Sequence, residues 1–301
     1  MEIHPTGQFD NSAKDYAHID AVPLSAAMGA EIRGIRVSDL TDESFAEVAD
    51  ALYRHKMIYF RDQDISHSDH EDFTHRFGAF GRDAYTAGLE GHPEIQPVLK
   101  EAESKAHMIF GGAWHTDSPF LPQPPAITIL MGRDIPPYGG DTMWANGALA
   151  YAFLSNTMKE TLTNLRVHMS ASTVLAEVKK GAEKFGDKSL GGTPLKFDPE
   201  PMIVGAFHPL VRTHPITGEK ALYVDDSYAV SIEGMTEPEA DAILGFLRHH
   251  ITQPAFTCRL RWEPNTLTVW DNRLCLHHAF NDHEGSRREM YRTTVLGEVP
   301  V

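Results

Sequence analysis

The stretch Phe256-Thr257-Cys258-Arg259-Leu260-Arg261-Trp262-Glu263-Pro264-Asn265-Thr266-Leu267-Thr268-Val269 decides the fold class of this chain. Its first half alternates apolar and polar side chains, which is the period-two pattern of a β-strand with one buried face. Pro264 and Asn265 then predict a turn, and Leu267 and Val269 resume the alternation. The stretch therefore predicts a β-hairpin near the carboxyl end of the chain.

Outward from this stretch, further strands occur with amphipathic helices before and between them. The regular alternation of strand and helix that a parallel βαβ sheet requires is missing, so we expect an all-β, antiparallel core with helical decoration. The patterns predict, in chain order, a helix over 42–54 capped by Thr41, a strand over 57–60, a helix from Ser66 or Ser68 to Gly78 with Ser68 and Glu71 as its capping box, a β-rich run over 126–131, and a helix opened by the capping box of Thr236 and Glu239.

The domain organisation is simple. Residues 1–20 are polar and predict a loosely held N-terminal arm, and 21–301 predict a single domain. Residues 179–201 are rich in Lys, Gly and Pro, which is typical of a surface loop, and we expect a lid around 170–205.

Composition excludes several classes of function. The 301 residues include 42 acids and 27 bases, and the formal net charge of −15 argues against binding to nucleic acid or to an anionic membrane. The sequence has no apolar run of transmembrane length, and its start has no apolar core of a signal peptide. The chain has only two cysteines, so we expect no disulfide framework. We therefore expect a cytoplasmic protein.

Trp114-His115-Thr116-Asp117 offers two metal ligands. Residues i and i+2 of an extended chain point to the same side, so His115 and Asp117 would present an imidazole and a carboxylate together. A lone His-x-Asp sequence is common in proteins where it has no function. It indicates a metal site only if another part of the chain supplies a third ligand.

That third ligand is available in Trp270-Asp271-Asn272-Arg273-Leu274-Cys275-Leu276-His277-His278-Ala279. This segment follows the predicted hairpin and places His277 or His278 where the chain leaves the β core. Two histidines and one carboxylate form the facial triad of non-haem Fe(II) oxygenases, which leaves three coordination positions open. An oxygenase needs two of them for a chelating 2-oxo acid and one for O₂.

Arg288 and Arg292 are four residues apart and would share one face of an extended strand. A guanidinium can hold a carboxylate through two hydrogen bonds. One arginine could therefore bind the far carboxylate of a dicarboxylate cosubstrate and the other an anion on the substrate, although a solvated basic turn is the common alternative.

Together these segments resemble the Fe(II)/2-oxoglutarate-dependent dioxygenases of the TauD/TfdA (taurine and 2,4-dichlorophenoxyacetate dioxygenase) family, from about Ile19 to Pro300. Four stretches carry the resemblance, in family order and at family spacing. They are Trp114-His115-Thr116-Asp117, Gly139-Gly140-Asp141-Thr142-Met143-Trp144, Trp270-Asp271-Asn272-Arg273 followed by His277, and the pair Arg288 and Arg292 at 11 and 15 residues beyond His277.

The resemblance implies a double-stranded β-helix, or jelly roll, with helices packed on its outside. It implies Fe(II) held by His115, Asp117 and His277 rather than His278, and 2-oxoglutarate held by Thr142 and Arg288. With O₂, the implied reaction hydroxylates a substrate C–H bond and releases succinate and CO₂. If that carbon bears a leaving group, cleavage of a C–O or C–S bond follows. Family habit also implies a homo-oligomer, either a dimer or a tetramer.

The substrate contacts depart from the taurine enzyme, which uses a histidine and an asparagine on early loops. This chain has Asp83 and Gly111 at those places, with Tyr85 nearby. By the same resemblance, Arg292 contacts an anionic group of the substrate or makes a second contact to the cosubstrate region. Tyr228 falls near a family position that lines the substrate pocket with an aromatic ring, although a half-buried loop tyrosine is an equal alternative. The expected substrate is a small anionic molecule, namely an aryloxyalkanoate, an alkylsulfonate or a sulfate ester.

Two other functions remain open from the sequence. One is a hydroxylase or desaturase that acts on a secondary metabolite or an amino-acid-like substrate. The other is a zinc hydrolase that uses the same three ligands and a bound water. The hydrolase is less favoured because it gives no role to the arginine pair or to the Gly-Gly-Asp-Thr segment.

Overall fold

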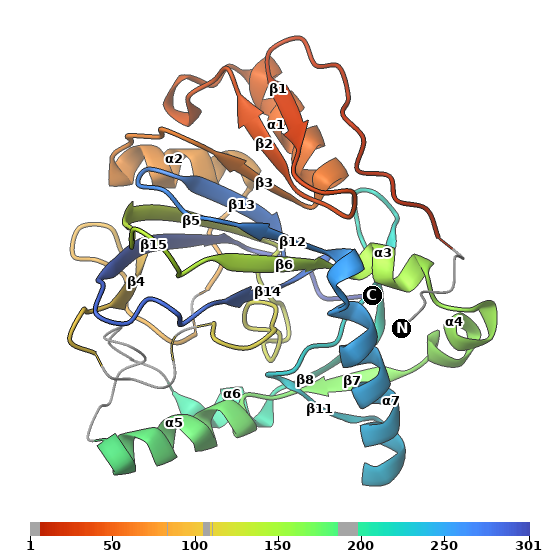
Figure 1. Cartoon of the computed structure of the whole chain (residues 1–301). Helices are drawn as coiled ribbons and strands as arrows, with labels where there is room; N and C mark the ends of the chain where they lie inside the picture. Colours follow the sequence, from red (N-terminus) through yellow and green to blue (C-terminus); the bar gives the residue numbers. More distant parts are fainter. Residues whose placement is uncertain (1–6, 83, 105–108, 110, 186–197) are drawn as a thin grey trace.

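Two β-sheets lie at the centre of the folded molecule (Figure 1). The structure is a computed structural model and describes residues 7–82, 84–104, 109, 111–185 and 198–301, so Asp83 lies outside the described residues. The large sheet contains β1 (Asp20–Pro23), β2 (Ala30–Arg33), β3 (Met57–Phe60), β4 (Gln96–Lys100), β5 (Ile127–Asp134), β13 (Leu267–Asp271) and β15 (Arg288–Val295). The small sheet contains β6 (Thr142–Asn146), β12 (Thr257–Leu260) and β14 (Cys275–Ala279).

Many neighbouring strands in the two sheets come from distant parts of the sequence. The large sheet runs β1-β2-β3-β13-β5-β15-β4, and the small sheet runs β12-β6-β14. The pairings in both sheets are antiparallel apart from β2 with β3, which confirms a β-rich, mainly antiparallel core. Two peripheral sheets contain β7 (Arg166–Met169), β8 (Ala206–Pro209) and β11 (Ala229–Ile232), and β9 (Val211–Thr213) with β10 (Lys220–Leu222).

Helices cover the sheets from outside, as expected (Figure 1). They are α1 (Asp42–His55), α2 (His67–Phe77), α3 (Gly147–Ala152), α4 (Asn156–Leu162), α5 (Ser172–Phe185), α6 (Pro199–Val204) and α7 (Glu237–Ile251), with the 3₁₀ turns η1 (Val37–Asp39) and η2 (Pro254–Phe256). No helix in the described part of the chain has the length and apolar character needed to cross a membrane.

The alternation of side chains along the large sheet separates two apolar layers. Ile58 of β3 and Val269 of β13 pack with α1 and α2 on one face. Met57 and Trp270 of the same strands point the other way, into a layer shared with Trp144 of the small sheet. The Trp144 and Trp270 rings lie 5.7 Å apart. The space between the two sheets is therefore a closed, largely apolar interior, and any polar side chain that points into it needs a partner.

The predicted hairpin is wrong, although both of its strands exist. β12 pairs with β6 in the small sheet, whereas β13 pairs with β3 and β5 in the large sheet. The turn at Pro264 and Asn265 therefore carries the chain from one sheet to the other. Backbone bonds from Asn265 to Gly132 and from Gly132 to Thr266 hold this crossing against β5. Period-two alternation identifies a strand but does not identify its partner.

Most local predictions agree with the structure. Thr41 caps α1, β3 has the predicted bounds, and Glu239 accepts the backbone N–H of Thr236 at the start of α7. The predicted capping box of α2 lies two residues too late, because Ser66 pairs with Asp69 instead of Ser68 with Glu71. Both serines precede an acid by three residues, so the pattern alone does not choose between them.

Two predicted loops are more ordered than their composition indicates. Residues 179–185 of the predicted surface loop belong to α5, and 199–201 belong to α6, while 186–197 lie outside the described residues. Within the N-terminal arm, Asn11 is buried against the backbone of Ser25 and Gly29, and the N–H groups of 17 and 18 donate to Glu47. The described part of the arm is thus fixed to α1 rather than loosely held.

A buried ion cluster holds the turn between β13 and β14. The carboxylate of Asp271 accepts bonds from Arg273 Nε at 2.8 Å and Nη2 at 2.6 Å, and from His214 Nε2 at 3.0 Å. Burial opposes ionisation of Asp271, but Arg273 and His214 outweigh it and hold the pKa of this carboxyl below its ordinary value. This turn leads directly to His277, so the cluster positions one of the candidate ligands.

We expect the Asp271→Asn variant to lose about 3–5 kcal/mol of unfolding free energy at pH 7, because it leaves the buried Arg273 without its closest partner. The pKa is lowered in the folded state, so this stabilisation is complete above about pH 4 and declines as the pH falls toward the folded pKa. Urea unfolding between pH 7 and pH 3 checks both points. The exposed Asp241→Asn on α7 is the control, and an equal Asp271→Asn deficit at both pH values would contradict the assignment.

Candidate functional site

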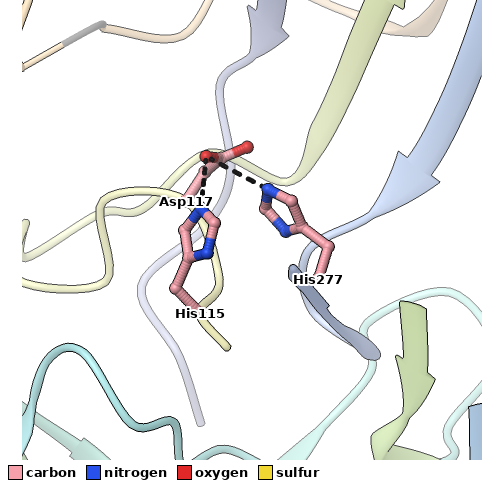
Figure 2. Close-up of side chains that lie close together, drawn as sticks. All are labelled: His115, Asp117 and His277. Carbon is pink, nitrogen blue, oxygen red and sulfur yellow. Dashed lines mark ion pairs between the residues drawn. The ribbon is translucent and has the colours of Figure 1, made fainter. Parts of the chain in front are cut away.

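His115, Asp117 and His277 lie together, with their side chains pointing toward one another (Figure 2). Their ligand atoms all lie within 4.8 Å of one another, and within the described chain they form the one group of this kind. Asp117 Oδ1 lies 4.0 Å from His115 Nε2 and 3.9 Å from His277 Nε2. All three residues are buried.

The backbone explains why these residues meet. His115 and His277 form an isolated antiparallel bridge, in which each backbone N–H donates to the other residue's carbonyl, at 3.0 and 2.7 Å. His277 is thereby placed across from His115, while Asp117 follows two residues later on the same side. The His-x-Asp pattern predicted that His115 and Asp117 lie together, and the backbone bridge to His115 brings His277 to them.

The donor set fits a divalent metal ion. Nδ1 of His115 lies 2.8 Å from the carbonyl of Ala113, which accepts its proton and leaves the Nε2 lone pair facing Asp117. Burial and the neighbouring His115 hold the pKa of His277 well below its ordinary value, so its ring is neutral. Burial raises the pKa of Asp117, but the positive charge of Arg292 and the hydrogen bond from Thr128 act against it and help hold that pKa below its ordinary value. Two imidazoles and one carboxylate match the facial triad.

His278 points away from this group. Its half-buried ring stacks on Phe280 at 4.9 Å and meets the edge of Trp114 at 5.6 Å. Successive residues on a strand face opposite sides, so the cluster admits only one of the two histidines.

Arg288 and Arg292 point from β15 into the same interior, as the shared-face argument expected. Arg288 is buried, and its Nε and Nη2 atoms have no hydrogen-bond partner among the described residues. Burial lowers its pKa to about 10, which leaves the guanidinium charged at neutral pH. A buried, charged fork with free donors is suited to an anionic ligand such as a carboxylate.

Thr142 and Arg288 both contact the same tryptophan, Trp262. The Trp262 Nε1–H donates to Thr142 Oγ1 at 2.9 Å, and the Arg288 guanidinium lies 5.8 Å from the centre of the Trp262 ring. The Thr142 hydroxyl accepts from the indole and keeps its own proton to donate. The preceding Gly139 and Gly140 both have positive φ, and a Cβ on Gly139 would lie 2.6 Å from the carbonyl oxygen of Asp282. A Cβ on Gly140 would lie 3.4 Å from Cδ of Arg288, so the two glycines let this turn pack closely against Asp282 and Arg288.

A cavity of about 190 Å³ opens beside the three ligands. Three of the four predicted substrate contacts, Tyr85, Tyr228 and Arg292, line it together with His115 and Asp117. The hydroxyls of Tyr85 and Tyr228 are hydrogen-bonded at 2.8 Å, and both rings are buried. Tyr228 therefore lines this cavity from the loop before β11, and it is buried rather than half-buried.

Arg292 reaches the ligand group itself. Its Nη1 donates to Asp117 Oδ1 at 3.2 Å, a contact that the sequence did not predict. Gly111, which the sequence placed at a substrate position, lies against the other ligand. It has a φ of +78°, and a Cβ there would lie 3.1 Å from Cε1 of His115. Glycine at 111 therefore keeps the metal-facing edge of His115 clear.

Asp225 is a residue that sequence reasoning missed. Its buried carboxylate accepts the backbone N–H of Tyr228 at 2.7 Å, Ala229 at 3.2 Å and Thr116 at 3.3 Å. Burial raises its pKa to about 6 against the effect of these donors. Asp225 thus joins the loop that carries Tyr228 to the segment that carries His115 and Asp117. Its sequence context, two adjacent acids before a serine, contains no signal for this role.

Comparisons with known proteins agree with this geometry. The family model described as "Taurine catabolism dioxygenase TauD, TfdA family" matches residues 20–294. An α-ketoglutarate-dependent sulfate ester dioxygenase of Pseudomonas putida is 32% identical over 294 residues, which cover 94% of this chain and 91% of that protein. The (S)-phenoxypropionate/α-ketoglutarate-dioxygenase of Sphingobium herbicidovorans is 26% identical over 281 residues, or 93% and 95% of the two chains. The crystal structure of a taurine dioxygenase from Burkholderia xenovorans superposes with a TM-score of 0.78 at 36% identity, covering 95% of this chain and 91% of that one.

Proposed function

This chain belongs to the TauD/TfdA family of Fe(II)/2-oxoglutarate-dependent dioxygenases, and from that premise we propose that it hydroxylates a C–H bond of a small anionic organic molecule. The observation that carries the proposal is that His115, Asp117 and Arg292 line one cavity, with His277 completing the ligand group. A hydrolase reading gains no support, because it leaves the buried charge of Arg288 without a purpose.

We propose His115, Asp117 and His277 as the ligands of Fe(II), and Arg288 with Thr142 as the residues that bind the far carboxylate of 2-oxoglutarate. Fe(II) with 2-oxoglutarate and O₂ supplies an oxidative decarboxylation that yields succinate and CO₂ and inserts oxygen into the substrate C–H bond. The chain contributes position and exclusion of water. Its ligand atoms are buried, and its two cationic side chains come from one face of β15.

For the substrate, we propose that Arg292 faces its anionic group and that Tyr85 and Tyr228 form the opposing wall. Asp83 remains a prediction, because it lies outside the described residues. The relatives that act on a sulfate ester and on a phenoxypropionate favour an anion next to a C–O bond. Hydroxylation at a carbon that bears such an oxygen gives a product that collapses with cleavage of the C–O bond, and a sulfonate would lose its C–S bond in the same way.

We further propose that the two sheets form the double-stranded β-helix (jelly roll) of the family, within a single domain over 21–301 that follows the arm at 1–20. The crossing at Pro264 and Asn265 from the small sheet to the large one supports this fold. A lid around 170–205, a dimer or tetramer, a cytoplasmic location and the lack of nucleic-acid or membrane partners stay predictions from the sequence. The buried, free Cys258 and Cys275 are compatible with a reducing compartment.

The test is anaerobic titration with Fe(II) and 2-oxoglutarate, followed by a substrate panel in air. We expect the weak visible charge-transfer band of the ternary complex, and then succinate release that rises at least about tenfold with one of the sulfate esters, alkylsulfonates or aryloxyalkanoates. Neutral analogues of the same carbon skeleton are the matched controls. The lack of a band would overturn the cofactor assignment, whereas equal stimulation by the neutral analogues would overturn only the anionic substrate.

A further inference from the structure

The Trp270-Asp271-Asn272-Arg273 segment precedes the ligand His277, and it is also connected by hydrogen bonds to the ligand Asp117. We propose that Thr128 and Asn272 are positioning residues that hold Asp117 so that a single carboxylate oxygen, Oδ1, faces the metal. The inference rests on the proposed function in one respect, namely that the metal binds at His115, Asp117 and His277.

A chain of three hydrogen bonds ends at Asp117. Trp270 Nε1 donates to Asn272 Oδ1 at 2.9 Å, Asn272 Nδ2 donates to Thr128 Oγ1 at 2.7 Å, and Thr128 Oγ1 donates to Asp117 Oδ2 at 2.6 Å. All four residues are buried.

Trp270 fixes which atom donates and which accepts in each of these hydrogen bonds. An indole N–H can only donate, so the amide oxygen of Asn272 must face Trp270 and the amide NH₂ must face Thr128. The Thr128 oxygen then receives the amide proton, and its own hydroxyl proton goes to Asp117. A threonine side chain has one proton to give, so Asp117 Oδ2 is committed to Thr128.

The two oxygens of Asp117 therefore have different surroundings. Oδ2 is bound by Thr128, whereas Oδ1 lies 4.0 and 3.9 Å from the Nε2 atoms of the two histidines. Arg292 donates to the same Oδ1. With Oδ2 occupied, the carboxylate cannot rotate to offer both oxygens without losing a buried hydrogen bond to a charged acceptor, which is unfavourable.

The surroundings of Thr128 hold its hydroxyl in a fixed position between the two sheets. Thr128 lies on the inter-sheet face of β5, where it is the register partner of Trp270, and its neighbours Ile127 and Ile129 face the opposite apolar layer. A hydroxyl buried in such an interior is unfavourable unless it is bonded. The backbone is fixed as well, because Asn272 N–H donates to Ala126 and the Asn272 carbonyl accepts from Thr116 Oγ1.

The experiment is titration of the metal-free protein with Mn(II) alone, followed by electron paramagnetic resonance, with the melting temperature of each metal-free variant as a second readout. Thr128→Val keeps the shape of the side chain and removes its hydroxyl. We expect it to raise the Kd for Mn(II) by about 10–100-fold, the usual effect of losing a partner of a metal ligand. Thr128→Ser keeps the hydroxyl, and we expect it to restore most of the affinity.

Thr268→Val is the matched control. Thr268 is buried two residues from Trp270 on the same face of β13, and within the described part of the chain its hydroxyl makes one long contact, at 3.4 Å to the Leu130 carbonyl. We expect a wild-type Kd from Thr268→Val and a melting temperature close to that of Thr128→Val. Equal weakening in both variants, or no rescue by serine, would reduce Thr128 to a packing residue and overturn the inference.

The outcomes also separate this inference from the proposed function. A wild-type chain that binds no Mn(II) would overturn both. A wild-type chain that binds Mn(II) with the same Kd as Thr128→Val would overturn the inference alone and leave the ligand assignment intact.

Discussion

Replacement of His277 by alanine is expected to abolish metal binding and turnover. The cluster contains three ligand atoms, and His277 supplies one of its two nitrogens. Loss of an outer partner of a ligand already costs 10–100-fold in metal affinity, so loss of the ligand itself should raise the Kd for Fe(II) by more than about 100-fold. Succinate release should fall to the background of free Fe(II), and the charge-transfer band with 2-oxoglutarate should disappear.

His278→Ala is the control for this variant because it changes the same residue type one position later. The His278 ring contacts Phe280 and Trp114 instead of the cluster. We expect it to lose about 0.5–1.5 kcal/mol of stability from these ring contacts and to keep its metal affinity. The opposite pattern, with activity lost in His278→Ala and kept in His277→Ala, would show that the wrong histidine is assigned.

The choice between these two histidines shows what the sequence could predict. Strand periodicity requires that only one of the two faces the ligands, but it does not say which one, and the family resemblance selected His277. The structure supplies the reason in the backbone bridge between His115 and His277. That bridge joins residues 162 positions apart, so no local pattern encodes it.

The same limit explains the wrong hairpin and the missed Thr128. The alternation at 256–262 is a property of one strand, whereas its pairing with β6 depends on side chains elsewhere in the chain. Thr128 has the sequence signal of any β-branched residue in an apolar strand. Its role is visible only once Asn272 and Asp117 are placed on either side of its hydroxyl. Local order was predictable, and long-range partners were not.

Arg288→Ala is the second change with a large expected effect, and it acts on the cosubstrate. Arg288 is a buried cation whose Nε and Nη2 have no partner among the described residues, so a bound carboxylate would supply the bonds that it lacks. Two charge-assisted hydrogen bonds contribute about 1.5–3 kcal/mol each. We therefore expect the KM for 2-oxoglutarate to rise by at least about 100-fold, with a much smaller change in the Kd for Mn(II) measured without cosubstrate.

The neighbouring Arg287 provides the matched control, because it has the same side chain and the opposite environment. It is partly exposed and paired with Glu101 at 3.1 Å and Asp134 at 3.3 Å, so its charge is already compensated. Arg287→Ala should leave the KM for 2-oxoglutarate within about twofold of wild type, since exposed ion pairs contribute only 0–1 kcal/mol. Steady-state kinetics at saturating substrate measure both variants. If the two arginines affect this KM equally, general electrostatic attraction rather than a specific site recruits the cosubstrate. A net charge of −15 argues against general attraction, because it would repel a dianion. The buried Arg288, with two donor atoms that lack a partner among the described residues, offers the local positive charge that a dianion needs.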